Sequence, residues 1–188
     1  ASQWAKANIE RLRSHAEQGT PIVGIEPSCL LTLRDEYPDL VPGEATRLVA
    51  KQAVLIDELV AQIAREEPGV AKLFRDDVQT QILLHTHCHQ KALVGSDATL
   101  AALRLVPGYE VELIDSGCCG MAGSFGFEAE HYEISQAMGE HRLFPAVRGA
   151  DGDTAIAVTG VSCRQQIDHF TGRRTRSVVE LLADALRS

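Results

Sequence analysis

The chain lacks a long apolar run, a signal sequence and an excess of positive charge. None of its 188 residues lies in an apolar stretch approaching the ~20 that a transmembrane helix needs, so we expect no membrane span. The first residues, Ala1-Ser2-Gln3-Trp4, are polar and contain no apolar core of a signal peptide. With 18 Lys and Arg against 26 Asp and Glu, the net charge is -8, which argues against a nucleic-acid partner.

The chain also lacks an initiator methionine, since its only methionines are Met121 and Met138. We therefore expect residues 1–188 to be the C-terminal fragment of a longer polypeptide, in which a first lobe is truncated. The composition, 45% hydrophobic and 23% charged, is that of an ordinary globular domain.

Five cysteines, an odd number without an export signal, favour a reducing compartment and roles other than disulfides. We expect a cytoplasmic location and leave peripheral association with the inner face of the membrane open. Cys118 and Cys119 are neighbours, and a disulfide between adjacent residues is strained and closes no loop. A metal ion or an iron–sulfur cluster, in contrast, can use two adjacent thiols.

The cysteines share a local context, because each follows a short apolar run of the kind that forms buried strands. These runs cover residues 21–26, 81–87, 110–115 and 154–159. Helical patterns separate them, so the sequence predicts an α/β fold with a mostly parallel open sheet and flanking helices. The recurring unit of strand, cysteine and helix also suggests pseudo-duplicated lobes.

The spacing of apolar residues predicts helices between these strands. They cover residues 4–18, 29–40, 44–66, 97–105, 128–143 and 177–187. We expect Pro38 to stop the second, and the long stretch 44–66 to be a single helix. The basic cluster at residues 173–176 is interpreted as a solvated loop.

In an open parallel sheet, ligands bind beyond the carboxyl ends of the strands. The pattern therefore predicts that the cysteines converge in one crevice and ligate metal: Cys29, Cys88, Cys118, Cys119 and Cys163. Thiolates bind both iron–sulfur clusters and structural zinc, and spacing alone does not separate the two.

A glycine-rich loop surrounds the adjacent cysteines. Gly117, Gly120 and Gly123 are candidate cofactor-binding residues, because glycine permits positive φ and close approach of the backbone to a ligand. Backbone N–H groups of such a loop can point at cluster sulfur. A phosphate cradle is the alternative, although the spacing differs from the G-x-G-x-x-G dinucleotide fingerprint.

Three histidines surround Cys88 at alternate positions. In an extended strand, His85, His87 and His89 would share one face and could ligate a metal, but packing near the site is the preferred interpretation. Lys91 could balance the charge of a cluster. Glu26 and Asp115, at strand ends, could orient or charge-balance the site.

Four motifs together resemble a known family. They are Gly24-Ile25-Glu26-Pro27-Ser28-Cys29, His85-Thr86-His87-Cys88-His89-Gln90-Lys91, Ser116-Gly117-Cys118-Cys119-Gly120-Met121-Ala122-Gly123-Ser124-Phe125-Gly126 and Val161-Ser162-Cys163-Arg164-Gln165-Gln166-Ile167. The chain is similar to the cysteine-rich CCG domain that occurs in heterodisulfide reductase and in the iron–sulfur subunits of glycolate oxidase and anaerobic glycerol-3-phosphate dehydrogenase. It is most similar to the C-terminal part of bacterial fusions of an FAD-linked oxidase with an iron–sulfur region, which oxidise D-2-hydroxy acids.

The resemblance implies a [4Fe–4S] cluster on Cys88, Cys118, Cys119 and Cys163, with Cys29 as a fifth ligand. In the heterodisulfide reductase branch such clusters are non-cubane and the motif ends in C-x-x-C. Here Gln166 replaces that last cysteine, which leaves the cluster type open.

The function that follows is electron transfer from flavin to an acceptor, either a quinone or a protein, within a D-lactate or D-2-hydroxyglutarate type dehydrogenase. FAD and ferredoxin-like domains would lie elsewhere in the polypeptide, so we expect this fragment to be catalytically incomplete. The alternatives are a structural zinc domain that docks partners and a phosphate- or nucleotide-binding domain that uses the glycine loop.

Overall fold

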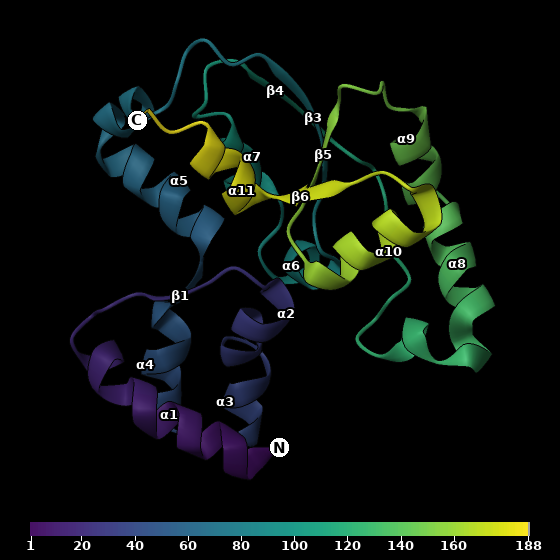
Figure 1. Ribbon diagram of the computed structural model, residues 1–188. Helices are drawn as coiled ribbons and strands as arrows, with labels where there is room; N and C mark the ends of the chain where they lie inside the picture. The colour runs from purple at the N-terminus through teal and green to yellow at the C-terminus, as the bar shows by residue number, and fades with distance from the viewer. Residues whose placement is uncertain (188) are drawn as a thin grey trace.

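The computed structural model describes residues 1–187 as two parallel sheets with helices around them (Figure 1). The strands are β1 (Ile22–Gly24), β2 (Ala53–Leu55), β3 (Thr80–His85), β4 (Tyr109–Leu113), β5 (Ala155–Val158) and β6 (Thr175–Ser177). β1 and β2 form one parallel pair, and the other four form a parallel sheet in the order β4-β3-β5-β6. The predicted α/β class with a parallel sheet is confirmed.

Helices connect the strands, as parallel pairing requires. They are α1 (Ser2–Glu17), α2 (Pro27–Leu30), α3 (Glu36–Leu40), α4 (Glu44–Gln52), α5 (Ile56–Glu66), α6 (Cys88–Leu93), α7 (Asp97–Leu103), α8 (Tyr132–Glu140), α9 (Leu143–Gly149), α10 (Val161–Thr171) and α11 (Val178–Asp184). Short 3₁₀ turns cover Leu31–Leu33, Pro68–Leu73, Phe125–Phe127 and Ala129–His131. Among residues 1–187, no helix combines the length and hydrophobicity that crossing a membrane requires.

Alternating side chains of the central strands bury both faces of the four-stranded sheet. Ile82 and Leu84 of β3 pack in one core with residues of α7 and α11. Ile156 and Val158 of β5 pack in a second core, on the opposite face, with Phe144 of α9 and residues of α10. A period of two in side-chain direction thus lets each strand contribute to both cores.

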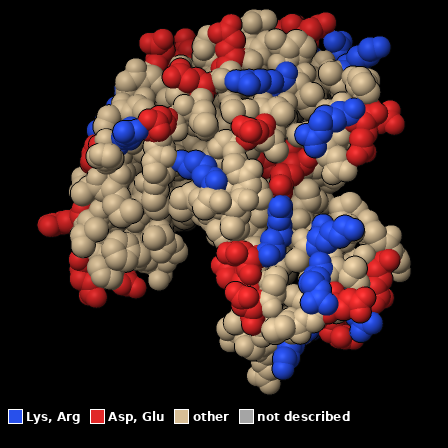
Figure 2. All heavy atoms as spheres, turned by 180° about the vertical axis from the view of Figure 1, so that it is seen from behind, with Lys and Arg blue, Asp and Glu red and all other residues tan. Residues whose placement is uncertain are grey.

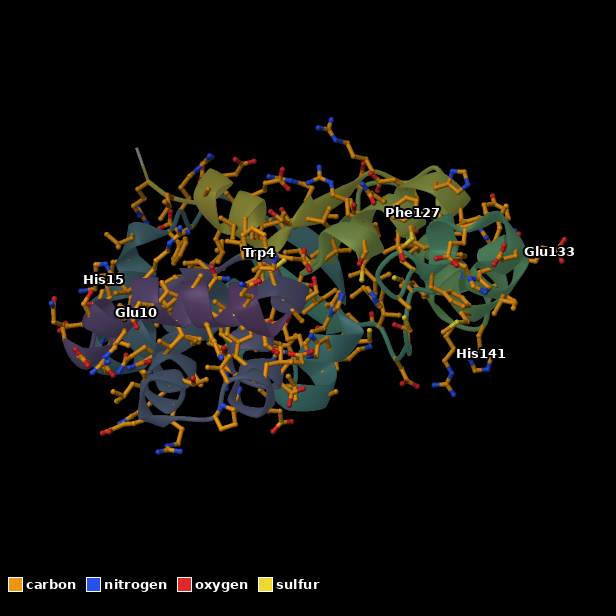
Figure 3. The ribbon with its side chains drawn as sticks, turned by 90° about the horizontal axis from the view of Figure 1, so that it is seen from below. Trp4, Glu10, His15, Phe127, Glu133 and His141 are labelled. Carbon is orange, nitrogen blue, oxygen red and sulfur yellow. The ribbon has the colours of Figure 1, made fainter. Side chains whose placement is uncertain are left out.

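The smaller β1–β2 sheet belongs to an N-terminal unit that also contains α1, α3 and α4 and lies below the four-stranded sheet in Figure 1. Ile9 of α1 packs against Val49 of α4, and both are almost fully buried. Figure 3 shows Glu10 and His15 along α1, far from Phe127 and Glu133 at the other end of the molecule.

The prediction of a single helix over residues 44–66 is wrong. Residues 53–55 leave the helical conformation and pair with β1 as strand β2. Glu58 then restarts the helix, because its carboxylate accepts a hydrogen bond from the backbone N–H of Leu55 at 2.9 Å. The apolar period continues through both helices, so the pattern alone did not reveal the strand between them.

Two further expectations are corrected. Residues 29–40 are divided among α2, a 3₁₀ turn and α3, and Pro38 lies inside the first turn of α3, where proline is tolerated. The basic cluster at residues 173–176 is not simply a solvated loop, because Thr175 is fully buried in strand β6. Arg173 donates hydrogen bonds to the carbonyls of Ala150 and Thr154, each at 2.9 Å.

Candidate metal centre

In the four-stranded sheet, cysteines follow the carboxyl ends of three strands. β3 leads to Cys88, the first residue of α6, β4 leads to Cys118 and Cys119, and β5 leads to Cys163 in the first turn of α10. The chain leaves β3 toward β4 on one side, whereas β5 lies on the other. This change of direction creates a crevice at the carboxyl ends, where open α/β sheets bind ligands.

The four thiols are linked by pairwise interactions. The Cys118 sulfur lies within hydrogen-bonding reach of both Cys88 and Cys119, and Cys119 also reaches Cys163. Among residues 1–187, no three of these sulfurs lie mutually within 4.8 Å. The crevice therefore offers four neighbouring donors, no three of which are close enough together to hold a single ion as they stand.

These contacts separate the four thiols into two kinds. Hydrogen bonds from Cys119 and Cys88 lower the pKa of Cys118 far below that of a free thiol. A hydrogen bond from Cys119, followed by His85, lowers the pKa of Cys163. The pKa values of Cys88 and Cys119 are raised, first because each shares a hydrogen bond with Cys118. Two thiolates thus form readily, and thiolates are the form that binds metal.

The backbone after Cys119 turns its N–H groups toward sulfur. The N–H of Gly120 donates to the Cys118 sulfur at 3.4 Å, and the N–H groups of Ala122 and Met121 reach Cys118 and Cys119. Gly120 and Gly123 have φ of +99° and +69°, and Ala122 has φ of +44°, which is unusual for a residue with a side chain. The loop thus directs at least one N–H donor, that of Gly120, at a cysteine sulfur.

Of the predicted cofactor-binding glycines, Gly120 has the clearest structural requirement. A Cβ there would overlap the carbonyl oxygen of Ser135 on α8, so the loop packs tightly against that helix. Gly123 lines the cavity beside the cysteines, with open space around its α-carbon. Gly117 precedes the cysteines, and its carbonyl accepts a hydrogen bond from Lys91 Nζ at 3.3 Å.

A cavity of about 280 Å³ opens beside the sulfurs and is lined by Cys88, Cys118 and Cys119. Glu26 and Ser28, from the end of β1 and the start of α2, line its other side. Cys29 is the next residue, but its side chain is exposed and does not line this cavity. The structure therefore brings four of the five predicted ligands together and leaves Cys29 beside them.

The three histidines do not share a face. β3 ends at His85 and a helix starts at Cys88, so strand alternation stops before His89. His85 Nδ1 lies 3.0 Å from Ser116 Oγ, and His87 lines the cysteine cavity. His89 turns away and lies 4.0 Å from Asp35. His85 and His87 thus lie at the cysteine site, and His89 does not.

The environment fits a bound inorganic group. Thr86 Oγ1 is a fully buried polar atom without a hydrogen-bond partner among the described residues, and the buried His85 interacts with Cys163. Gly160 leaves room for the His87 ring, which a Cβ would overlap. Four thiols, a buried histidine beside them and backbone N–H donors match the needs of an iron–sulfur cluster.

Glu26 and Lys91 form contacts around the cysteines that the sequence did not indicate. The Glu26 carboxylate accepts a hydrogen bond from the N–H of Val161 at 2.8 Å and so joins β1 to the helix that carries Cys163. Lys91 Nζ donates to the carbonyls of Ser116 and Gly117, which places a positive charge directly behind Cys118. Neither contact could be recognised from residue spacing, because each joins segments that follow different strands.

Of the remaining residues, Asp115 points away from the cysteines, whereas Gln166 lies close to their loop. The Asp115 side chain is 93% exposed and pairs with Arg142 at the surface. Gln166, which occupies the last position of the C-x-x-C pattern, is buried one helical turn after Cys163 on the same side of α10, where its Nε2 donates to Ser135 Oγ at 2.7 Å. A Cβ on Gly120, the residue after Cys119, would lie 3.1 Å from Gln166 Nε2, so position 166 adjoins the cysteine loop.

A parallel α/β sheet that presents cysteines from three adjacent strand ends defines a cysteine-rich ligand-binding domain. Residues 82–168 match the family model of the cysteine-rich domain, CCG. This segment contains the four converging cysteines and excludes Cys29. The recognition from sequence is thereby confirmed.

The chain is also similar to curated dehydrogenases. It is 30% identical to one subunit of the anaerobic glycerol-3-phosphate dehydrogenase of Escherichia coli K12, over 99% of this chain and 46% of that protein. It is 30% identical to the D-2-hydroxyglutarate dehydrogenase of the same organism, and 31% to that of Pseudomonas putida, over 18% and 17% of those proteins. The chain thus spans less than half of these relatives. No solved structure matches it.

Proposed function

We propose that this chain is an iron–sulfur electron-transfer module of an FAD-linked D-2-hydroxy acid dehydrogenase of the D-lactate or D-2-hydroxyglutarate type. The supporting observation is the convergence of Cys88, Cys118, Cys119 and Cys163 in one crevice with backbone N–H groups aimed at their sulfurs. The names of the curated relatives point the same way.

The proposed cofactor is a [4Fe–4S] cluster, of either the cubane or the non-cubane kind. Cys88, Cys118, Cys119 and Cys163 would hold it, and Cys29 is the candidate fifth ligand. When bound, such a cluster accepts and donates single electrons at a potential set by its surroundings. The N–H groups of Gly120, Met121 and Ala122 and the charge of Lys91 would stabilise its negative charge, and so raise that potential.

Structural zinc is the competing proposal, and the sulfur geometry disfavours it. Zinc binds four thiolates at about 2.3 Å in a tetrahedron, which puts the sulfurs about 3.8 Å from one another. Here no three of the sulfurs lie mutually within 4.8 Å among residues 1–187. This wider spacing suits several iron atoms better than one central ion.

The remaining assignments extend this proposal. Residues 1–188 would form the CCG-type C-terminal part of a longer polypeptide, with a first lobe truncated and with flavin and ferredoxin-like domains in cis. Electrons would leave to a quinone or a protein acceptor, in the cytoplasm or at the inner face of the membrane. Figure 2 shows acidic and basic side chains interspersed over one face, without the continuous basic surface that nucleic acid would require.

The test is a set of single serine variants, reconstituted with iron and sulfide without oxygen. Replacement of Cys88, Cys118, Cys119 or Cys163 is expected to lower the bound iron and to change the visible spectrum. Cys29→Ser is the matched comparison, because its side chain is exposed, and any loss of iron there would establish it as a ligand. Unchanged iron and spectrum in Cys118→Ser would reject the proposal.

A further inference from the structure

A second cavity, of about 380 Å³, lies between the two sheets at the carboxyl ends of β1, β2, β5 and β6. It adjoins the cysteine cavity, because Glu26 and Val161 line both. Its volume falls within the range of small-molecule binding sites. The cysteine chemistry does not use this space, yet one layer of side chains separates the two cavities.

The walls of this interlobe cavity are mostly apolar. Leu55, Val158 and Val178 are buried contributors, and Ile25 and Val161 form part of the exposed rim. A molecule that fills the cavity would therefore gain most of its binding free energy from buried apolar surface.

The charged groups around the cavity disfavour an anion. Three carboxylates line it, those of Glu26, Asp57 and Glu180, against the single cation Arg164, which is already paired with Glu180 at 3.3 Å. Two of the N–H groups at the helix N-termini beside the cavity are also occupied. Glu26 accepts from the N–H of Val161, and Glu180 accepts from that of Ser177 at 2.6 Å. The cavity is thus suited to an uncharged ligand.

One buried acceptor atom beside the cavity, Gln90 Oε1, lacks a hydrogen-bond donor among the described residues. Gln90 lines the cavity and is 1% exposed. Its Nε2 donates to Asp57 at 3.0 Å and to Thr99 at 2.9 Å. Asp57 only accepts and the Thr99 hydroxyl donates to it, so the amide nitrogen of Gln90 must face this pair. Gln90 Oε1 is therefore fixed in place, without a partner among the described residues.

We propose that the interlobe cavity is the acceptor site, and that it binds a quinone and its hydroquinone. This inference rests on the proposed function and names the acceptor class. Such a molecule is uncharged and flat, has an apolar ring, and in its reduced form carries hydroxyl donors for Gln90 Oε1. Two successive single-electron transfers from the proposed cluster, which the flavin in cis reduces again between them, and two protons from solvent convert the quinone into the hydroquinone, so electrons and protons balance.

Anaerobic calorimetric titration with 1,4-naphthohydroquinone tests this site directly by binding. We expect saturable binding with one site per chain. Ile25→Asp, at the exposed rim, should weaken it by about tenfold or more, because a carboxylate replaces an apolar contact. Ile134→Asp is the matched control, since Ile134 is similarly exposed on α8 but lies outside the cavity, and it should leave binding unchanged.

A second pair of measurements tests the chemistry of the site. Gln90→Leu, checked for an unchanged far-UV spectrum and cooperative melting, should weaken the hydroquinone more than 1,4-naphthoquinone, which has no hydroxyl donor. The anion 2-naphthoate should bind much more weakly than the hydroquinone. Absence of saturable hydroquinone binding, equal binding by Ile25→Asp and wild type, or equally tight binding of 2-naphthoate would overturn the inference.

The titration separates this inference from the proposed function, because it is run on the chain before and after reconstitution with iron and sulfide. A chain that holds a cluster but binds no hydroquinone would contradict the acceptor site alone. A chain that binds hydroquinone at this cavity but no cluster would contradict the electron-transfer function, and with it the acceptor role of the site.

Discussion

The carboxylate of Glu26 accepts a hydrogen bond from the backbone N–H of Val161 at 2.8 Å, across 135 positions of the sequence. Its other oxygen accepts from Ser28 Oγ at 2.7 Å. One side chain thus fixes the end of β1, the start of α2 and the start of α10, and it lies in the walls of both cavities. The position of the N-terminal unit relative to Cys163 depends on this contact.

Replacing Glu26 with alanine should loosen this junction. We expect Glu26→Ala to lower the free energy of unfolding by about 1–2 kcal/mol, since it removes a charged acceptor at a helix N-terminus. Urea denaturation measures this loss. Glu10→Ala, on the exposed face of α1 seen in Figure 3, is the control and should change stability by less than about 0.5 kcal/mol. Equal effects of the two substitutions would contradict the assigned role of Glu26.

A second prediction follows from the tight turn after the adjacent cysteines. Gly120→Ala should be strongly destabilising, because the residue has positive φ and its new Cβ would overlap the carbonyl oxygen of Ser135. Gly123→Ala also has positive φ but open space, so it should cost only about 1–2 kcal/mol. Thermal melting of the two variants compares them, and a smaller loss in Gly120→Ala than in Gly123→Ala would contradict the packing described.

Gln166 distinguishes this chain from the C-x-x-C pattern. Because position 166 lies one helical turn after Cys163 and beside Gly120, Gln166→Cys should place a further thiol next to the cysteine loop, and the cluster spectrum after reconstitution should differ from that of wild type. The variant should lose about 1–3 kcal/mol of stability, since the buried Ser135 hydroxyl loses its partner. A cluster spectrum and an iron content identical to those of wild type would show that position 166 does not reach the site.

The carboxylate of Glu180, at the start of α11, makes a pH-dependent contribution to the stability of the folded state. The pKa of Glu180 is lowered, first by the backbone N–H of Ser177, with which it forms a capping box. The folded state prefers the charged form of Glu180. The stabilisation that this carboxylate provides is therefore fully present above the ordinary carboxyl pKa, about 4.3, and disappears as the pH falls through the lowered pKa. Glu180→Gln should therefore be less stable than wild type by about 0.5–1 kcal/mol at neutral pH, with a smaller difference below about pH 4.

Denaturation at a series of pH values measures that difference. Glu133→Gln is the control, because Glu133 is exposed on α8 and forms no hydrogen bond or ion pair within residues 1–187. A stability difference for Glu180→Gln that grows as the pH falls would have the wrong sign for a lowered pKa.

The sequence predicted the larger sheet and its cysteines because each strand is a local apolar run that ends at a motif. β3, β4 and β5 lie within the predicted runs, give or take one residue at their starts, and the contacts among Cys88, Cys118, Cys119 and Cys163 follow from parallel strand order. Strand β2 was missed because Ala53–Leu55 continues the helical apolar period, and only pairing with β1 makes it a strand.

Other features depend on tertiary contacts that no local pattern contains. The roles of Glu26 and Lys91 arise because distant strand ends meet. The strand alternation expected through His89 fails because α6 starts at Cys88, and Asp115 was misplaced because its side chain turns to Arg142. The interlobe cavity lies between two sheets whose relative position the sequence did not specify.

The most direct test of the central claim is the metal content of the protein purified without oxygen, with iron, acid-labile sulfide and zinc measured per chain. The account predicts about four iron and about four sulfide per chain, with a broad visible absorbance that is lost in Cys118→Ser. One zinc per chain without sulfide, found also in the full-length protein from its native host, would contradict it and establish a structural metal site instead.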